Sequence, residues 1–188
     1  LPDTVFVIVG EQKALAGLQQ VCAEYGVENV LLLPFQPREQ LPEMLAAADA
    51  GLVIQKSNVV AFNMPSKIQV LLASGRPIVA SVPLTGTAAR AIQQSGGGVV
   101  VSPEQPELLA DAIVNLYSDP DQAKELGQQG RRYAMQHYSF EKALSRYEKL
   151  FYDVTNSSSS GKKARAVSRR PSEIRPIVAD ALPAELLS

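Results

Sequence analysis

The chain has 188 residues, of which 46% are hydrophobic, so it is long enough to bury the core of one α/β domain. Its 18 basic and 19 acidic residues leave a formal net charge of −1, which argues against nucleic acid as the main partner. A single cysteine, Cys22, excludes an internal disulfide framework and agrees weakly with a reducing compartment. The apolar runs fall well short of the ~20 residues that a membrane-spanning helix needs, and we expect no signal peptide.

Apolar, β-branched runs alternate along the chain with segments of helical periodicity. Strands are predicted at residues 4–9, 29–33, 50–54, 77–82 and 99–101. Helices are predicted at residues 11–25, 38–48, 65–74, 85–94, 104–117, 120–136 and 140–153. Gly26 and Gly75 are typical helix stops, and Asp119 and Ser139 are typical N-caps. The first two strands have the composition of strands that are buried on both faces, as in parallel sheets.

This alternation predicts an α/β fold with a doubly wound, parallel, Rossmann-like sheet, followed by three helices without a further strand. We expect residues 1–154 to form this domain and residues 155–188 to form a disordered, low-complexity tail. Within the tail, residues 178–187 have the pattern of a short helix. The tail carries six basic and three acidic residues, a balance that fits peripheral contact with a membrane or an acidic partner, although most such tails are only solvated.

Ligands of an open parallel sheet bind beyond the carboxyl ends of its strands, and one of these ends precedes a long polar loop at residues 55–64. That loop leads to Pro65, Ser66 and Lys67 at the start of a predicted helix. Free N–H groups and the helix dipole favour an anion there, Ser66 adds a hydroxyl donor, and Lys67 adds a positive charge. The pattern therefore predicts a phosphate site without a Walker motif, although the same residues also suit an ordinary helix N-terminus.

Other candidate groups give weaker signals. Residues 85–87 (Thr-Gly-Thr) are a second anion contact of low specificity, and His137 is interpreted as a surface residue at a helix end. Residues 96–98 (Gly-Gly-Gly) precede a strand and lack the dinucleotide-binding pattern, so they are interpreted as a turn. Cys22 is interpreted as inert packing. Histidines and acids do not occur at metal-binding spacing, so no metal site is expected.

The order of these segments resembles the C-terminal domain of family 4 glycosyltransferases of GT-B fold. The segments that carry the resemblance are residues 6–10, 29–37, 41–54, 65–67, 72–80, 98–104, 118–120 and 130–133. The closest subgroup is the colanic-acid and O-antigen exopolysaccharide transferases, on the basis of residues 64–67 (Met-Pro-Ser-Lys) and 72–77 (Leu-Ala-Ser-Gly-Arg-Pro). The resemblance covers residues 4–152. It starts after the first strand and helix of the family's domain, so the chain, which opens at Leu1 directly before a strand, looks like an excised fragment.

The resemblance implies retaining, hexosyl-type transfer from a nucleoside-diphosphate sugar to a glycan or lipid-linked acceptor in bacterial cell-surface polysaccharide biosynthesis. It implies that the base lies at Pro34, Phe35 and Gln36, the sugar at the 55–64 loop, and the diphosphate at Ser66 and Lys67. The donor-binding residues predicted in this way are Gly10, Pro34, Phe35, Gln36, Asn63, Met64, Pro65, Ser66, Lys67 and Val70. No residue is assigned as catalytic, and no cofactor or metal is expected besides the donor.

Partners implied by the resemblance are the nucleotide sugar, the acceptor, and an N-terminal GT-B domain of the same chain. A location in the cytoplasm, at the inner face of the membrane, follows from the same comparison. Since the acceptor-binding domain is not part of these 188 residues, we expect the fragment alone to be inactive.

The sequence departs from the family at two places. Many members carry two glutamates eight residues apart, of which the second holds the ribose hydroxyls; Phe62 and Val70 occupy these positions here. The segment that normally supplies the central strand is also absent, so the strands at 4–9 and 51–54 should share no neighbour and the fragment should be marginally stable. The departures leave two alternatives open: a catalytically degenerate GT-B module that binds a nucleotide or acts as a scaffold, and, less favoured, a GT-B sugar epimerase.

Overall fold

The computed structural model describes residues 1, 3–59 and 64–157. The strands are β1 (Phe6–Gly10), β2 (Val30–Pro34), β3 (Gly51–Ile54), β4 (Ile78–Ser81) and β5 (Gly98–Val101). The helices are α1 (Gln12–Glu24), α2 (Leu41–Ala47), α3 (Ser66–Ser74), α4 (Thr87–Ser95), α5 (Pro106–Ser118), α6 (Pro120–His137) and α7 (Phe140–Ser157), with a short 3-10 turn, η1 (Arg38–Gln40), before α2. The alternation predicted from the sequence is confirmed, as is the run of three helices after the last strand.

The chain divides into two compact units, residues 1–147 and 148–188. The larger unit holds all the described strands and the helices up to the first turns of α7. In the smaller unit the described part is the remainder of α7, which continues past residue 154 to Ser157. The predicted helix at residues 178–187 lies outside the described residues.

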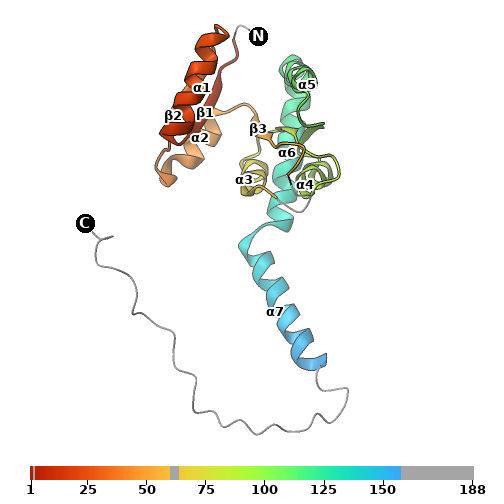
Figure 1. Ribbon diagram of the computed structural model, residues 1–188. Helices are drawn as coiled ribbons and strands as arrows, with labels where there is room; N and C mark the ends of the chain where they lie inside the picture. Colours follow the sequence, from red (N-terminus) through yellow and green to blue (C-terminus); the bar gives the residue numbers. More distant parts are fainter. Residues whose placement is uncertain (2, 60–63, 158–188) are drawn as a thin grey trace, which may run out of the picture. The chain divides into compact units, whose positions relative to one another are not determined.

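All described strand pairs are parallel, and they form two separate sheets (Figure 1). In the first sheet β1 pairs with β2, in a register that places Phe6 opposite Val30 and Gly10 opposite Pro34. In the second sheet β4 lies between β3 and β5, with Gly51 opposite Ile78 and Ile78 opposite Gly98. As expected, β1 and β3 do not pair, and each has one edge without a partner strand among the described residues.

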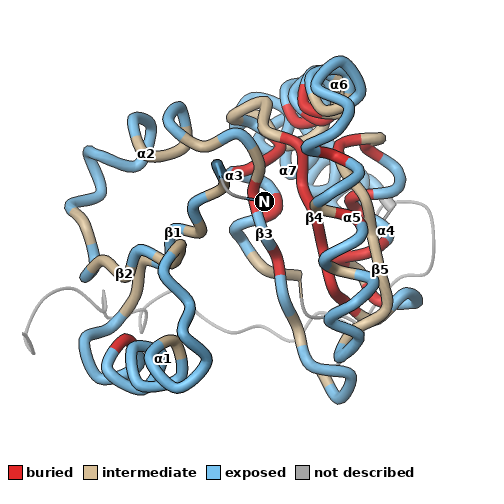
Figure 2. Tube along the Cα trace, turned by 90° about the horizontal axis from the view of Figure 1, so that it is seen from above, coloured by how far each residue is buried: buried red, intermediate tan, exposed pale blue. Residues whose placement is uncertain are grey.

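The core belongs to the second sheet. Its buried residues come from β3, β4, α3, α4 and α6, and Figure 2 shows them as a red zone around β4. The largest fully buried side chains are Ile68, Leu72, Ile78, Ile92, Val79 and Val82. Each such side chain contributes about 1.5–3 kcal/mol relative to an exposed position, so this part of the fold carries most of the hydrophobic stabilisation. A smaller cluster around Val79, Ala112 and Leu116 covers the α5 side of the sheet.

The prediction that the first two strands are buried on both faces is wrong. Val7 in β1 is 55% exposed and Leu31 in β2 is 47% exposed, and the only buried residue of α1 is Leu15. The physical reason is that a two-stranded sheet has few neighbours: α1 packs against β2, while β1 lacks a second partner strand among the described residues. The apolar sequence of β1 is therefore typical of a strand buried on both faces, but the described residues do not cover both faces of β1.

In the described part of the chain, each helix is too short or too polar to cross a membrane.

Candidate functional site

Strand pairing brings the first group of predicted donor-binding residues together. Gly10 is the last residue of β1 and lies opposite Pro34, the last residue of β2. Phe35 follows as an exposed ring, 73% accessible, and the Gln36 side chain folds back so that Nε2 donates to the Pro34 carbonyl at 2.8 Å. An apolar ring and an amide therefore stand at the carboxyl end of this sheet, where such a sheet receives its ligand.

The first turn of α3 has the properties of an anion site. Pro65 is the N-cap, with an extended backbone (φ −62°, ψ 128°), and no side chain caps the turn. The Ile68 amide donates to the Pro65 carbonyl at 3.1 Å, whereas Ser66 and Lys67 precede the first i→i−4 bond of the helix. Their side chains are exposed, and Lys67 forms no ion pair with any described residue. The turn thus presents unpaired N–H groups beside a hydroxyl and an ammonium group.

Local sequence fixes this helix firmly in place. Pro65 cannot donate a backbone hydrogen bond and suits a helix start, and Gly75 ends the helix in the left-handed region (φ 78°). Between them Ile68, Leu71 and Leu72 form the buried face of α3. Because one side of the helix packs into the core, the core determines where its exposed first turn lies.

The remaining predicted residues fall into three situations. Met64 is half-buried and packs against the core, next to the start of α3. Val70 lies on α3 and is 38% exposed, so its position is accessible although its side chain accepts no hydrogen bond. Asn63 and Phe62 lie outside the described residues. The structure thus groups Gly10 with residues 34–36, and Met64 with residues 65–67, on two different sheets.

A second helix start lies at the carboxyl end of β4, at the Thr-Gly-Thr segment for which a weak anion contact was expected. Gly86 is the N-cap of α4, and no side chain caps the turn. The Thr87 hydroxyl is buried and has no hydrogen-bond partner among the described residues. This is an additional polar group at the edge where ligands bind.

Two titratable groups with displaced pKa values lie on α6 and directly after it. Hydrogen bonds from Gln129 and Arg132 lower the pKa of Glu125 on α6. Burial raises the pKa of Tyr138, which follows α6. Among the residues that the structure describes, no cluster of His, Cys, Asp or Glu could hold a metal ion.

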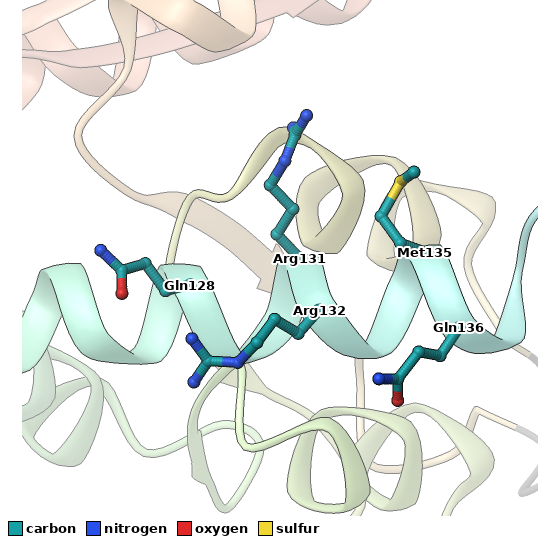
Figure 3. Close-up of a pocket in the computed structure, with 5 residues that line it drawn as sticks. All are labelled: Gln128, Arg131, Arg132, Met135 and Gln136. Atoms are coloured by element: carbon teal, nitrogen blue, oxygen red, sulfur yellow. The ribbon is translucent and has the colours of Figure 1, made fainter.

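A shallow hollow on α6 lies elsewhere on the molecule. Its lining consists of Gln128, Arg131, Arg132, Met135 and Gln136, which all stand on this one helix (Figure 3). A second hollow lies where α4 meets α6 and is also remote in the fold from the carboxyl ends of the strands. Neither hollow has the enclosed, convergent shape of a ligand site.

The family of the chain is shown by a comparison of its sequence with known protein families. The sequence profile of the family described as glycosyl transferases group 1 matches residues 1–133. The chain belongs to this family. The resemblance noted from the sequence motifs is therefore confirmed.

Two curated members of the family illustrate its range. The colanic acid biosynthesis glycosyl transferase WcaI of Escherichia coli (strain K12) is 30% identical over 110 residues, which is 58% of this chain and 27% of WcaI. A GDP-mannose-dependent phosphatidylinositol monomannoside mannosyltransferase of Mycolicibacterium smegmatis is 28% identical over 161 residues, or 80% of this chain and 40% of the enzyme. The chain thus spans well under half the length of these relatives.

Solved structures confirm the fold. HepE of Anabaena, determined in complex with UDP, superposes with a TM-score of 0.67 at 20% sequence identity, over 83% of this chain and 42% of HepE. The likeness shows that the chain has the α/β, Rossmann-like GT-B fold of glycosyltransferases.

Proposed function

We propose that the protein transfers a sugar, with retention of anomeric configuration, from a nucleoside-diphosphate sugar to a glycan or lipid-linked acceptor in bacterial cell-surface polysaccharide biosynthesis. The main observation behind this proposal is the first turn of α3, which no side chain caps and which presents Ser66 and Lys67. This turn lies at the carboxyl end of a parallel sheet, in a chain of the group 1 glycosyltransferase family. A phosphate group is a ligand that the N-terminus of a helix binds readily, and a nucleoside diphosphate carries two of them.

The proposed donor spans both sheets. The base lies against Phe35, with Gly10, Pro34 and Gln36 around it, and the diphosphate lies at Ser66 and Lys67. Asn63, Met64, Pro65 and Val70 complete the contacts that we propose for the sugar and ribose.

Charge stabilisation is the chemical role that we propose for the α3 turn. Negative charge builds on the departing diphosphate as the glycosidic bond breaks. The N–H groups of the turn, the Ser66 hydroxyl and the Lys67 ammonium would stabilise that charge from fixed positions. We therefore expect the nucleotide sugar as co-substrate and no separate cofactor.

Partners and location follow from the same proposal. WcaI is named for colanic acid biosynthesis and the mycobacterial relative acts on a phosphatidylinositol mannoside, so a glycan or a lipid-linked glycan is the acceptor class that we propose. The activity would require the further chain that the longer relatives contain, including an acceptor-binding domain. We propose the cytoplasm, at the inner face of the membrane, as the site of action.

A catalytically degenerate module is the second candidate, and Val70 is the observation that favours it. At a position where many members of the family have a glutamate, a valine leaves the ribose hydroxyls without an acceptor. Such a module would bind a nucleotide weakly, or act as a scaffold, without turning over a donor.

Donor turnover by the full-length protein separates the two candidates. UDP-, GDP- and dTDP-sugars are incubated with the protein, water serves as the acceptor, and the anomer of the released sugar is followed by proton NMR before mutarotation. We expect slow release from one nucleotide class with the anomeric configuration of the donor, and its loss in Lys67→Ala. An inverted product would contradict the retaining mechanism, and nucleotide binding without any release would favour the degenerate module.

A further inference from the structure

The carboxyl end of β3 presents a side-chain amide that is not among the predicted donor-binding residues. Gln55 directly follows the last residue of β3, and its backbone N–H donates to the Ser81 carbonyl at 2.9 Å, so Gln55 keeps the register of the strand. Its side chain is half-buried and forms no hydrogen bond with another described residue. Such an amide has two N–H donors and an acceptor available, at the end of a parallel strand where ligands bind.

The alternation of β3 places the Gln55 side chain on the face of the sheet that α3 covers. The first and third residues of β3 are buried, and the second and fourth are exposed. On the buried face, a Cβ atom added to Gly51 would collide with the Leu71 side chain of α3. Val53 belongs to the same buried cluster as Ile68 and Leu71. Residue 55 continues this alternation, so it stands on the α3 side.

Gln55 also lies level with the first turn of α3 along the strand direction. Because α3 joins the parallel strands β3 and β4, it runs opposite to β3 and begins at the carboxyl end of that strand. Measured from the contact between Gly51 and Leu71, Ser66 lies five residues back along the helix, or about 8 Å. Gln55 lies four residues onward along the strand, or about 13 Å. An oxygen bound to the first-turn N–H groups lies about 3 Å beyond Ser66, which is within about 2 Å of the level of Gln55.

This placement depends only on β3, β4 and α3, which pack together around the three-stranded sheet. The central strand that the resemblance implies would pair with the other edge of β3. Pairing at an edge leaves the two faces of a strand unchanged, so Gln55 keeps its position beside α3 in the full-length protein.

We propose that Gln55 is a further donor-binding residue, whose side-chain amide donates a hydrogen bond to the diphosphate at the first turn of α3. This inference rests on the proposed function, and it assigns the first residue of the 55–64 loop to the diphosphate and not to the sugar. A hydrogen bond to a charged group is stronger than one between neutral groups. The amide therefore adds a fixed donor to those of Ser66 and Lys67, without a further charge, as the diphosphate departs.

The variants replace the amide by groups of similar size. Gln55→Met removes the hydrogen-bond donors and keeps most of the volume, and Gln55→Glu places a negative charge beside the diphosphate. Gln128 on α6 receives the same two substitutions as a control, because its side chain is exposed and stands on a helix outside the proposed donor site (Figure 3). All variants are made in the full-length protein, together with Lys67→Ala.

Calorimetry below the melting temperature of each variant gives the dissociation constants for UDP, GDP and dTDP, and inorganic pyrophosphate is titrated as a competitor of the nucleotide. For the nucleotide that the wild type binds, we expect Gln55→Met to weaken binding about tenfold, as the loss of a hydrogen bond to a charged group does. Gln55→Glu should weaken it further, because the carboxylate repels the diphosphate. Pyrophosphate should lose affinity by a similar factor, and the Gln128 variants should stay within about twofold of the wild type.

Two results would overturn the inference and leave the proposed function intact. The first is wild-type affinity in both Gln55 variants while Lys67→Ala weakens binding. The second is a loss of nucleotide affinity with unchanged pyrophosphate affinity, since Gln55 would then contact a part of the ligand other than the diphosphate. If the wild type binds none of the three nucleotides, the proposed function itself fails and this inference fails with it.

Discussion

Glycine residues on the helices of this protein meet very different surroundings. A Cβ atom built on Gly127, in α6, would lie 2.1 Å from the Gly75 carbonyl oxygen. A Cβ atom on Gly17, in α1, would have nothing within 4 Å. Gly127 thus lets the backbone of α6 approach the end of α3, whereas Gly17 lies in a helix without any steric need for glycine.

The paired substitutions Gly127→Ala and Gly17→Ala test this difference. Gly127→Ala should destabilise the full-length protein by more than about 2 kcal/mol, because α6 must move away from α3. Gly17→Ala should stabilise it by up to about 1 kcal/mol, because alanine is the better helix former. Urea unfolding midpoints measure both effects, and a Gly127→Ala protein as stable as the wild type would show that α6 and α3 are packed less closely than described.

The place of a candidate residue in the fold could be predicted only where a local pattern marks it. Pro65, Ser66 and Lys67 were expected at the start of a helix after a long loop, and the structure places them there, whereas their role in binding stays a prediction. The hydrogen bonds of Arg76 could not be predicted, since its carbonyl partners, Leu45 and Ala46, lie 31 and 30 residues earlier in the chain. A contact of that range depends on tertiary packing, and no local pattern encodes it.

At the scale of elements, helix boundaries were predicted well because they depend on neighbouring residues. Asp119 accepts a hydrogen bond from the Gln122 amide, and Ser139 accepts one from the Lys142 amide, so both predicted N-caps are confirmed. Gly75 ends α3 as expected, and Gly96 ends α4 in the same left-handed conformation.

Strand burial was predicted less well, because it depends on neighbours that the strand sequence does not specify. Val7 and Leu31 have the composition of buried strand residues and are exposed in the two-stranded sheet of β1 and β2. By contrast every residue of β4 is buried, since β4 has a strand on each side and helices over both faces. The same β-branched pattern therefore has two outcomes, which are decided by the number of partner strands.

At the scale of the whole molecule, the separation into two sheets has a consequence for stability. Because no strand pairing joins the two sheets in the described part of the chain, residues 1–153 on their own should not unfold in one sharp, cooperative transition. We expect a broad transition in which the sheet of β1 and β2 loses structure first, because none of its strand residues is buried. Thermal unfolding of the isolated monomer, followed by circular dichroism, measures this, and a single steep transition would contradict it.

The central claim is that a nucleoside diphosphate binds at the first turn of α3. The most direct test is a thermal-shift scan of the full-length protein against UDP, GDP, dTDP and their sugars, with Lys67→Ala beside Lys124→Ala, an exposed lysine on α6. We expect one nucleotide to raise the melting temperature of the wild type and of Lys124→Ala, and Lys67→Ala to lose this shift. A well-folded wild type without a shift for any nucleotide, or a shift that persists in Lys67→Ala, would show that the nucleotide does not bind at this turn.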